Sequence, residues 1–321
     1  MVADRAAVQA TPSSSTAACR DHGPRGGGSA PSASAARSWR GELQLDYRLF
    51  QGRTVARDRH EGPLRVLKAL YPDDGLTCEH VMVHPPGGLA GGDHLTVQAH
   101  LHAGSRVRVT TPGATRFYKS LGASAVQSVH LNLDEGARLE WLPMETIAYA
   151  GCRAVNECRI SLAPGATMIG WDLCCLGLPA SGDAFRSGSI QQHLEVQGVW
   201  LERGLIQAED HLLRDSPLGL QGHPVVASLW CATGSGWSGA FREHVLQAGL
   251  QALTAAEADP ARTARAQLAA GGITSPHDQV VVFRALADAV EPVFESFQRV
   301  RDAWHRAMWQ YPAPTPRIWR L

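Results

Sequence analysis

Three similar segments in the middle of the chain constrain its fold more than any other feature. Each begins with a run of alternating apolar residues, passes through a turn that ends in glycine and a small residue, and continues as a second run. The turn glycines are Gly104, Gly136 and Gly165, which are 32 and 29 residues apart. Alternation is typical of half-buried strands, and a near-regular repeat is typical of units stacked on one core. The sequence therefore predicts stacked strand–turn–strand units, with chance similarity between ordinary meander strands as the alternative.

Most of the remaining chain also has strand-like patterns. These runs are rich in alternating or β-branched residues and are separated by turn residues. They span residues 41–50, 64–70, 78–84, 189–196, 199–207, 224–232 and 279–286.

Two segments have helical patterns instead. Residues 241–258 combine helical spacing with strong helix formers. A second helix is expected after Asp288, a suitable N-cap, with Glu291 three residues later and Pro292 in the first turn. Its apolar stripe is expected to pack in the core. The stripe consists of Val290, Phe294, Phe297, Val300, Trp304 and Met308. The predicted fold is mainly β, with stacked hairpin-like strands in a β-helix or two-layer arrangement and two α-helices, one near the C-terminus.

Residues 1–38 differ in composition from the rest of the chain. They are rich in Ala, Ser, Gly, Pro and Arg, a composition that offers too little apolar surface for burial to offset the entropy lost on ordering. We expect a disordered arm over residues 1–38 and a single domain over residues 39–321. The arm lacks the apolar run of about 7–15 residues that marks a secretory leader, and no stretch reaches the ~18 apolar residues of a membrane span.

Charge and cysteine content narrow the compartment and the partners. The thirty basic and thirty acidic side chains cancel, which disfavours nucleic acid or an anionic membrane as the main partner. Seven cysteines, an odd number, favour free thiols in a reducing compartment. We expect a cytoplasmic protein with no nucleic-acid and no membrane partner.

The glycine-rich stretch HPPGGLAGGD, residues 84–93, invites comparison with a phosphate-binding loop. Gly87 and Gly92 have the spacing of such a loop, but Asp93 and His94 follow where lysine and a hydroxyl residue are needed. A carboxylate at that position would repel phosphate. The dinucleotide pattern also fails, because Leu89 stands where its second glycine would fall. The stretch is therefore not expected to bind nucleotide.

Acidic residues offer one route to catalysis. Glu140 and Glu145 resemble a general acid and base pair, but Pro143 lies between them and sequence spacing does not fix the distance between their carboxylates. No GxSxG motif is present. A carboxylate-using hydrolase on a β-solenoid scaffold, with Glu140, Glu145 and Asp172, is kept as an alternative, as is an all-β interaction module with no metal role.

Metal-binding motifs are also lacking. The sequence contains no CxxC and no HExxH motif, which argues against a tight zinc site. A weak or transient site of carboxylate, imidazole and water ligands leaves little trace in a sequence, so the lack of motifs does not exclude such a site.

Five motifs stand out together along the chain. They are HPPGGLAGGD (84–93), TTPGATRFYKS (110–120), LEWLPMETIAY (139–149), WDLCCLGLPASGDAF (171–185) and the terminal PRIW (316–319). In this order they resemble the motifs of a known family, the urease accessory protein UreD family, called UreH in some organisms. The resemblance covers residues 39–321, and the arm has no counterpart in the family pattern.

The resemblance implies a non-enzymatic scaffold or chaperone for urease maturation. Family members are expected to support GTP-dependent nickel insertion into apo-urease. They bind a UreF-like protein directly and a UreG-like GTPase through it. The resemblance implies that a partner hydrolyses GTP, which agrees with the mismatch between residues 84–93 and a phosphate-binding loop. No tightly bound cofactor is implied, only transient Ni²⁺.

The resemblance also singles out the residues of the first two motifs as a structural turn. In that interpretation the glycines permit positive φ and close backbone approach, and Asp93 accepts hydrogen bonds from loop amides. The residues are His84, Pro85, Pro86, Gly87, Gly88, Gly91, Gly92, Asp93, Thr111, Pro112, Gly113, Thr115, Arg116 and Tyr118.

Stacked units would also bring several polar residues together. The second strands of the three units would lie side by side near the glycine-rich turn, and acids there could line a hydrated passage whose negative potential favours Ni²⁺. Arg116 neutralising one of these acids is the structural alternative. The expected lining residues are Thr110, Thr111, Glu140, Glu145 and Asp172. The expected transient nickel ligands are His84, Asp93 and Glu140.

Overall fold

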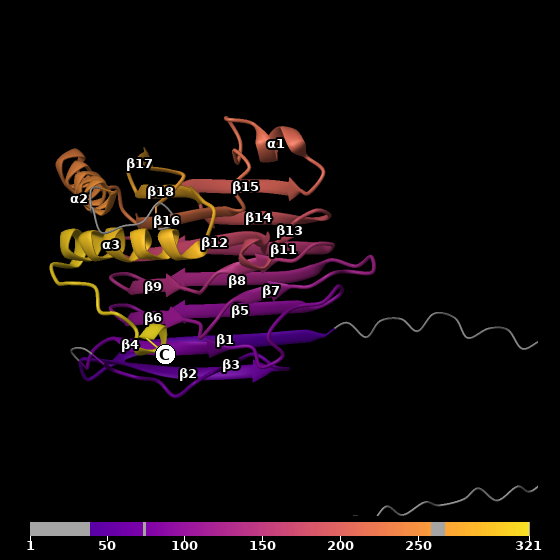
Figure 1. Ribbon diagram of the computed structural model, residues 1–321. Coiled ribbons are helices and arrows are strands. Elements are labelled where there is room, and N and C mark those ends of the chain that lie inside the picture. The colour runs from indigo at the N-terminus through magenta and orange to yellow at the C-terminus, as the bar shows by residue number, and fades with distance from the viewer. Residues whose placement is uncertain (1–38, 73–74, 258–266, 321) are drawn as a thin grey trace, which may run out of the picture. The chain divides into compact units, whose positions relative to one another are not determined.

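Successive stretches of the chain alternate between two β-sheets that pack face to face (Figure 1). The computed structural model describes residues 39–72, 75–257 and 267–320. The first sheet has the strand order β15 (Trp200–Gln207), β14 (Gly188–Val196), β11 (Cys152–Leu162), β8 (Ala125–Leu133), β5 (His94–Leu101), β1 (Arg40–Phe50) and β2 (Arg53–Glu61).

The second sheet has eleven strands. Its main path is β17 (Ala270–His277), β18 (Val280–Ala287), β16 (Val225–Thr233), β12 (Thr167–Leu178), β9 (Arg138–Leu142), β6 (Arg106–Thr110), β4 (Cys78–Val83) and β3 (Arg65–Val66). Three short strands lie off this path: β7 (Thr115–Phe117), β10 (Thr146–Ala148) and β13 (Asp183–Ala184).

The predicted stack of repeated units is confirmed. The first strands of the units, β5, β8 and β11, pair in parallel in one sheet, and the second strands, β6, β9 and β12, pair in parallel in the other. The two strands of a unit therefore pair with neighbouring units and not with each other, which gives a β-solenoid-like coil. Gly104, Gly136 and Gly165 make the turns possible, because their φ angles are 71°, 67° and 76°.

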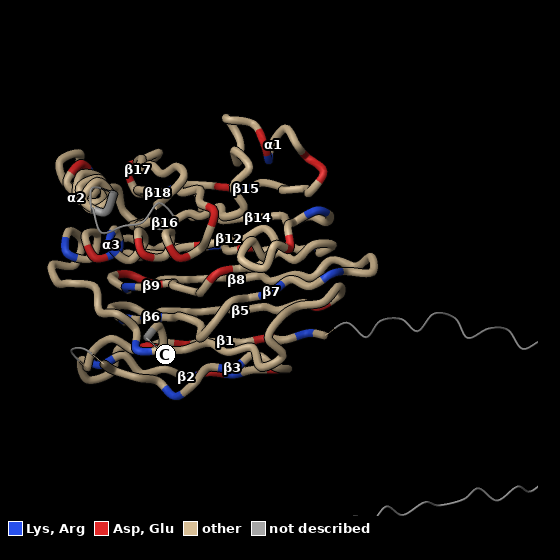
Figure 2. Tube along the Cα trace, in the orientation of Figure 1, with Lys and Arg blue, Asp and Glu red and all other residues tan. Residues whose placement is uncertain are grey.

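Two apolar cores hold three layers together. The larger core fills the space between the sheets. The second lies between the eleven-stranded sheet and the helices α2 (Gly239–Glu257) and α3 (Val290–Trp309), which cover the outer face of that sheet (Figure 1). Phe297, Val300 and Trp304 of the predicted stripe are fully buried there. Basic and acidic residues are interspersed over the whole fold and not segregated (Figure 2).

Several local expectations need correction. The strand expected over residues 64–70 is reduced to β3. Beyond Val66 the chain contacts β4 through a hydrogen bond from the Leu67 amide to the Val81 carbonyl at 2.9 Å and through the bridge between Leu70 and Glu79. A short third helix, α1 (His211–Asp215), was not expected, although Asp210 caps it by accepting a hydrogen bond from the Leu213 amide at 3.0 Å. Turns of 3₁₀ helix occur at Pro179–Ser181 and Arg317–Arg320.

The predicted N-cap of α3 is wrong. The helix begins at Val290, and its N-cap is Ala289, which is extended and makes no side-chain cap. Asp288 instead contacts the Nδ1 atom of His223 at 2.7 Å. Glu291 and Pro292 do lie in the first turn, as expected. The expected arm, residues 1–38, lies outside the described residues. Within the described part of the chain, no helix is both long and apolar enough to cross a membrane.

Candidate functional site

A row of polar side chains interrupts the apolar core between the two sheets. Gln127, Asn156 and Gln192 stand opposite one another on β8, β11 and β14. The Asn156 amide donates to the Asp172 carboxylate at 2.9 Å and to the Gln192 carbonyl at 3.1 Å, and it accepts a hydrogen bond from Gln127 at 3.2 Å. Asp172 comes from β12, so this network connects the facing sheets.

Asp172 is the acid of this row. Its pKa is raised to about 6, chiefly by burial and also by the charge of Glu202, while hydrogen bonds from Gln192 and Asn156 act in the opposite direction. No basic side chain among the described residues forms an ion pair with it. A buried carboxylate without a positive partner is costly, so Asp172 favours either a proton or a cation.

Three cavities follow one another along this row. The first, of about 230 Å³, lies beside the glycine-rich turn and is bordered by His84, Thr111 and Gln127. The second is small, about 30 Å³, and lies between Gln127 and Asp172. The third, of about 200 Å³, extends from Asp172 to Glu202 on β15. Because neighbouring cavities share a lining residue, the row follows the inter-sheet space across the stacked units.

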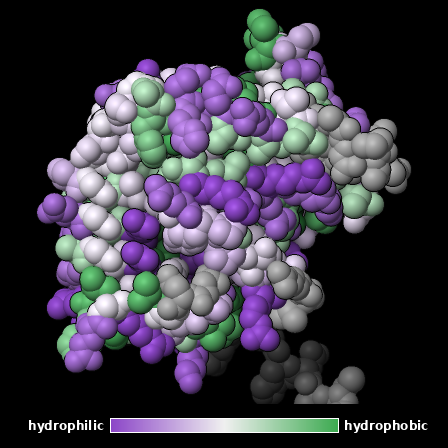
Figure 3. Space-filling model, turned by 90° about the vertical axis from the view of Figure 1, so that its left-hand side faces the viewer, coloured by the Kyte–Doolittle hydropathy of each residue, from purple (hydrophilic) through white to green (hydrophobic). Residues whose placement is uncertain are grey.

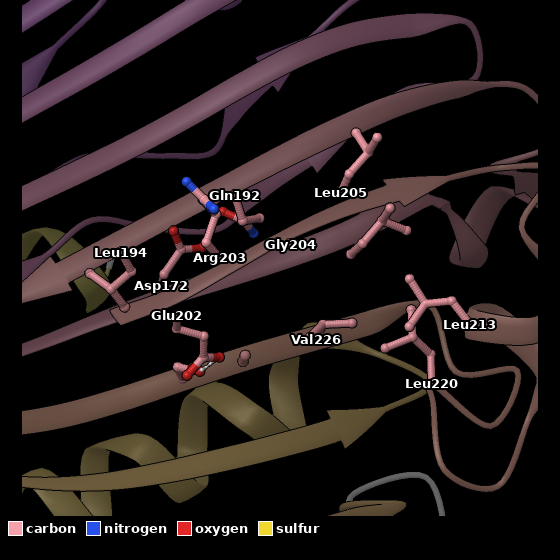
Figure 4. Close-up of a pocket in the computed structure, with 13 residues that line it drawn as sticks. Asp172, Gln192, Leu194, Glu202, Arg203, Gly204, Leu205, Leu213, Leu220 and Val226 are labelled. Atoms are coloured by element: carbon pink, nitrogen blue, oxygen red, sulfur yellow. Dashed lines mark hydrogen bonds between the residues drawn. The ribbon is translucent and has the colours of Figure 1, made fainter. Parts of the chain in front are cut away.

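The third cavity has a polar and an apolar end (Figure 4). Asp172, Gln192 and Glu202 gather at one end, and Leu213 and Leu220 lie at the other. Glu202 accepts hydrogen bonds from Ser228 at 2.9 Å and from Arg284 at 3.0 Å. The charge of Glu202 is thus compensated, whereas no basic side chain in the described ranges forms an ion pair with Asp172.

The glycine-rich turn closes against the second motif. Gly87 and Gly92 have φ angles of 79° and 97°. A β-carbon on Gly88 would lie 2.8 Å from the Arg116 carbonyl oxygen, and one on Gly91 would lie 2.8 Å from the carbonyl oxygen of Ala123. These positions therefore require glycine for two reasons, backbone angle and close approach.

The ends of the turn carry its polar side chains. The Asp93 carboxylate accepts hydrogen bonds from the Ala90 amide at 2.8 Å and the Trp39 amide at 3.3 Å. Pro85 and Pro86 follow His84 directly and enter the turn. Burial lowers the pKa of His84, although the charge of Asp93 acts in the opposite direction. His84 is therefore held towards its neutral form, in which a ring nitrogen can bind a metal.

The second motif is tied to neighbouring loops. The Thr111 hydroxyl donates to the Gly113 carbonyl at 3.0 Å and accepts from the Met144 amide at 2.9 Å. The Thr115 amide donates to the Glu145 carbonyl at 2.9 Å. Other members border the first cavity or stack nearby. Pro112, Gly113, Thr115 and Arg116 line that cavity, and Tyr118 packs against Tyr149 with ring centroids 5.2 Å apart.

Glu140 lies on the opposite face of the sheet from Asp172. Its carboxylate pairs with Arg108 at 2.7 Å and with Arg301 of α3 at 2.6 Å, and Arg108 also pairs with Glu79 at 2.8 Å. Burial alone would raise the pKa of Glu140, but these two arginines and His305 hold it well below its usual range. Arg108 and Arg301, and not Arg116, neutralise this acid.

The remaining predicted residues are also away from the cavity row. The Thr110 hydroxyl donates to the Leu142 carbonyl at 2.7 Å and accepts from Trp319 at 2.9 Å. Glu145 borders a separate groove of about 750 Å³ with Asp288 and Glu291. Of the five expected lining residues, the structure places only Thr111 and Asp172 on the row. The acids invoked for a hydrolase are likewise not brought together.

Comparison with known proteins gives the family. The family model described as UreD urease accessory protein matches residues 40–320. The chain is 50% identical to a urease accessory protein UreD of Polaromonas sp. (strain JS666) over 284 residues, which is 88% of this chain and 100% of the relative. It is 49% identical to that of Variovorax paradoxus (strain S110), over 88% and 99% of the two chains. The chain belongs to the UreD family. It is therefore an accessory protein of urease and not an enzyme.

Sequence reasoning missed the three amides of this UreD-family chain. Gln127, Asn156 and Gln192 occupy positions of their strands that face the other sheet, among apolar neighbours. A polar residue within the apolar register of a strand is therefore the signal that could have found them.

Proposed function

We propose that this chain is a scaffold through which Ni²⁺ reaches apo-urease in the cytoplasm, in a GTP-dependent reaction with a UreF-like protein and a UreG-like GTPase. The observation that carries the proposal is the uncompensated Asp172 carboxylate within a row of cavities. A divalent cation beside it would supply the missing positive charge.

The chemistry of the row suits transient binding. Ni²⁺ accepts imidazole, carboxylate and water ligands, and a conduit must bind it weakly enough to release it. His84 and Thr111 border the first cavity, Asp172 joins the second and third, and Glu202 borders the third. Donors are therefore spread along the row and do not form one closed ligand set, which favours passage over storage.

GTP hydrolysis is assigned to a partner. The glycine-rich turn is closed against the backbone of Arg116 and Ala123, and Asp93 stands where a phosphate-binding loop has lysine. A nucleotide at this turn would meet a carboxylate and not an ammonium group.

Exposed apolar side chains suggest where a protein partner docks. Leu212 and Leu218, in and after α1, are 82% and 100% exposed, and Leu201 and Leu205 on the edge strand β15 are about half exposed. On the face shown in Figure 3, by contrast, hydrophilic residues form a broad band and hydrophobic residues are scattered. We assign the β15–α1 end of the stack to a partner, because clustered exposed apolar residues mark interaction surfaces.

Reconstitution tests the proposal. Apo-urease is incubated with Ni²⁺, GTP and the UreF- and UreG-like proteins, with and without the full chain, and urease-bound nickel is counted after gel filtration. We expect nickel insertion only when this chain and GTP are both present, together with a stable complex between this chain and the UreF-like protein. Equal insertion without the chain, or no complex, would contradict the proposal.

A further inference from the structure

Two histidines and two aspartates meet on the outer face of the seven-stranded sheet, at one end of strands β1, β5 and β8. Asp46 and His100 are directly opposite each other in the parallel pairing of β1 with β5. Both point away from the inter-sheet core, since their strand neighbours Leu45 and Leu101 are buried in it. His102 follows just beyond the end of β5. Asp134, just beyond the end of β8, completes the group.

The four side chains are in direct contact. His102 Nε2 lies 2.8 Å from Asp46 Oδ2, and its Nδ1 lies 3.4 Å from Asp134 Oδ2. His100 Nε2 lies 3.0 Å from Asp134 Oδ1, and the two imidazole centroids are 4.1 Å apart. One ligand atom each from Asp46, His100 and His102 can be chosen so that all lie within 4.8 Å of one another.

We propose that Asp46, His100 and His102 form a binding site for a borderline divalent transition-metal cation such as Zn²⁺, Ni²⁺ or Cu²⁺. Ligand atoms about 2.1 Å from such an ion lie about 3–4 Å from one another, so small side-chain rotations suffice. Two imidazoles and one carboxylate suit these ions, whereas Mg²⁺ and Ca²⁺ prefer oxygen ligands alone.

Asp134 has the position of an orienting carboxylate. A metal-binding histidine usually donates its second ring N–H to a carboxylate, which fixes the ring and its tautomer. When His102 binds the ion through Nε2, its Nδ1 is already beside Asp134. Asp134 is therefore a positioning residue for the imidazoles.

The site is open to solvent and separate from the cavity row. Asp46 and His100 border a hollow of about 1020 Å³, and the four side chains are 30–44% exposed, so water can complete the coordination. Arg48 pairs with Oδ1 of Asp46 at 2.8 Å, which leaves Oδ2 on the side of His102. Asp172 faces the inter-sheet space instead. The site stands independently of the proposed nickel passage.

Metal titration of the full chain tests this site. Zn²⁺ binding is measured by calorimetry, histidine ring resonances are followed by NMR, and Cu²⁺ is used for electron paramagnetic resonance. In the wild type we expect the His100 and His102 resonances to shift together on Zn²⁺ addition, and two nitrogen couplings in the Cu²⁺ spectrum. His102→Ala, or Asp46→Asn, should weaken this Zn²⁺ affinity at least about tenfold. His94→Ala, an exposed change at the start of the same strand, is the matched control and should leave it unchanged.

One further variant tests the role of Asp134, and three results would overturn the proposed metal site. Asp134→Asn should weaken Zn²⁺ binding while both nitrogen couplings persist, because it orients the rings without binding the ion. A His100→Ala/His102→Ala double variant that binds Zn²⁺ like the wild type would overturn the proposal. So would a wild type whose His100 and His102 resonances ignore Zn²⁺, or displacement of Zn²⁺ by an equal concentration of Mg²⁺.

Discussion

Two acids on neighbouring strands of one sheet, Glu140 on β9 and Asp172 on β12, have opposite environments. Glu140 faces the helix layer and is 3% exposed, and two arginines hold its pKa well below the usual range. Asp172 faces the other sheet among amides, and burial raises its pKa to about 6. The first carboxylate is neutralised within the fold, whereas the second has no ion-pair partner in the part of the chain that the structure describes.

Under the proposed function, one face of the sheet would contribute to stability and the other to cation binding. The chain of ion pairs from Glu79 through Arg108 and Glu140 to Arg301 links β4, β6 and β9 to α3. Its charges satisfy one another, so a passing cation would gain little there. When it is deprotonated, Asp172 can offer its charge to a cation, because no basic side chain among the described residues forms an ion pair with it.

The largest effect is expected from Glu140→Leu. The change leaves Arg301 buried without its carboxylate, and it should lower the free energy of unfolding by about 3–5 kcal/mol. Urea denaturation at pH 7 measures this. Asp172→Leu, the same kind of change on the opposite face, should be neutral or stabilising at that pH. Similar losses in both variants would remove the contrast between the two acids.

A second variant sharpens the same contrast. Glu140→Leu combined with Arg301→Leu removes both charges, while Arg108 keeps Glu79. Replacing a buried ion pair by apolar side chains is often neutral, so the double variant should recover at least about 2 kcal/mol of the loss. Denaturation of the single and double variants gives the coupling energy. If the double variant recovers no stability, the unpaired charge of Arg301 is not the cause of the loss in Glu140→Leu.

The pH dependence of stability distinguishes Asp172. Its folded-state pKa of about 6 lies above the ordinary value of 3.8, so between these pH values the folded protein keeps a proton that the unfolded chain releases. The stabilisation is present below about pH 4 and is lost as pH rises through 6. At ~1.4 kcal/mol per pKa unit, the stability difference between wild type and Asp172→Asn should fall by up to about 3 kcal/mol from pH 4 to pH 7. A constant difference would show that Asp172 titrates normally.

The smallest effect is expected from Glu202→Gln. Because the negative charge of Glu202 contributes to the raised pKa of Asp172, its removal should lower that pKa. Carbon-13 NMR of the Asp172 carboxyl group measures the change. An unchanged or higher pKa would contradict a contribution from the Glu202 charge.

The sequence predicts the stack well, because Gly104, Gly136 and Gly165 mark its period directly. It cannot predict which acids share a face. Ile169 is the residue paired with Glu140, so Asp172 falls three residues further along β12 and points the other way. A shift of one residue in the pairing of β9 with β12 would put Glu140 and Asp172 on the same face of the sheet, and no local sequence pattern determines that register. The motif that contains Glu140 also gives no sign of Arg301, which neutralises this acid although it lies 161 positions away in the sequence.

Nickel transfer through the assembled complex tests the central contrast most directly. Apo-urease is loaded with Ni²⁺ in the presence of GTP, the partner proteins and either wild-type chain, Asp172→Asn or the exposed control Asp183→Asn, and urease-bound nickel is measured over time. If the uncompensated carboxylate carries the ion, Asp172→Asn should form the full complex yet load nickel at least about tenfold more slowly, a change of ~1.4 kcal/mol in the barrier. Asp183→Asn should match wild type. Loading by Asp172→Asn at the wild-type rate, with the complex intact, would contradict the account.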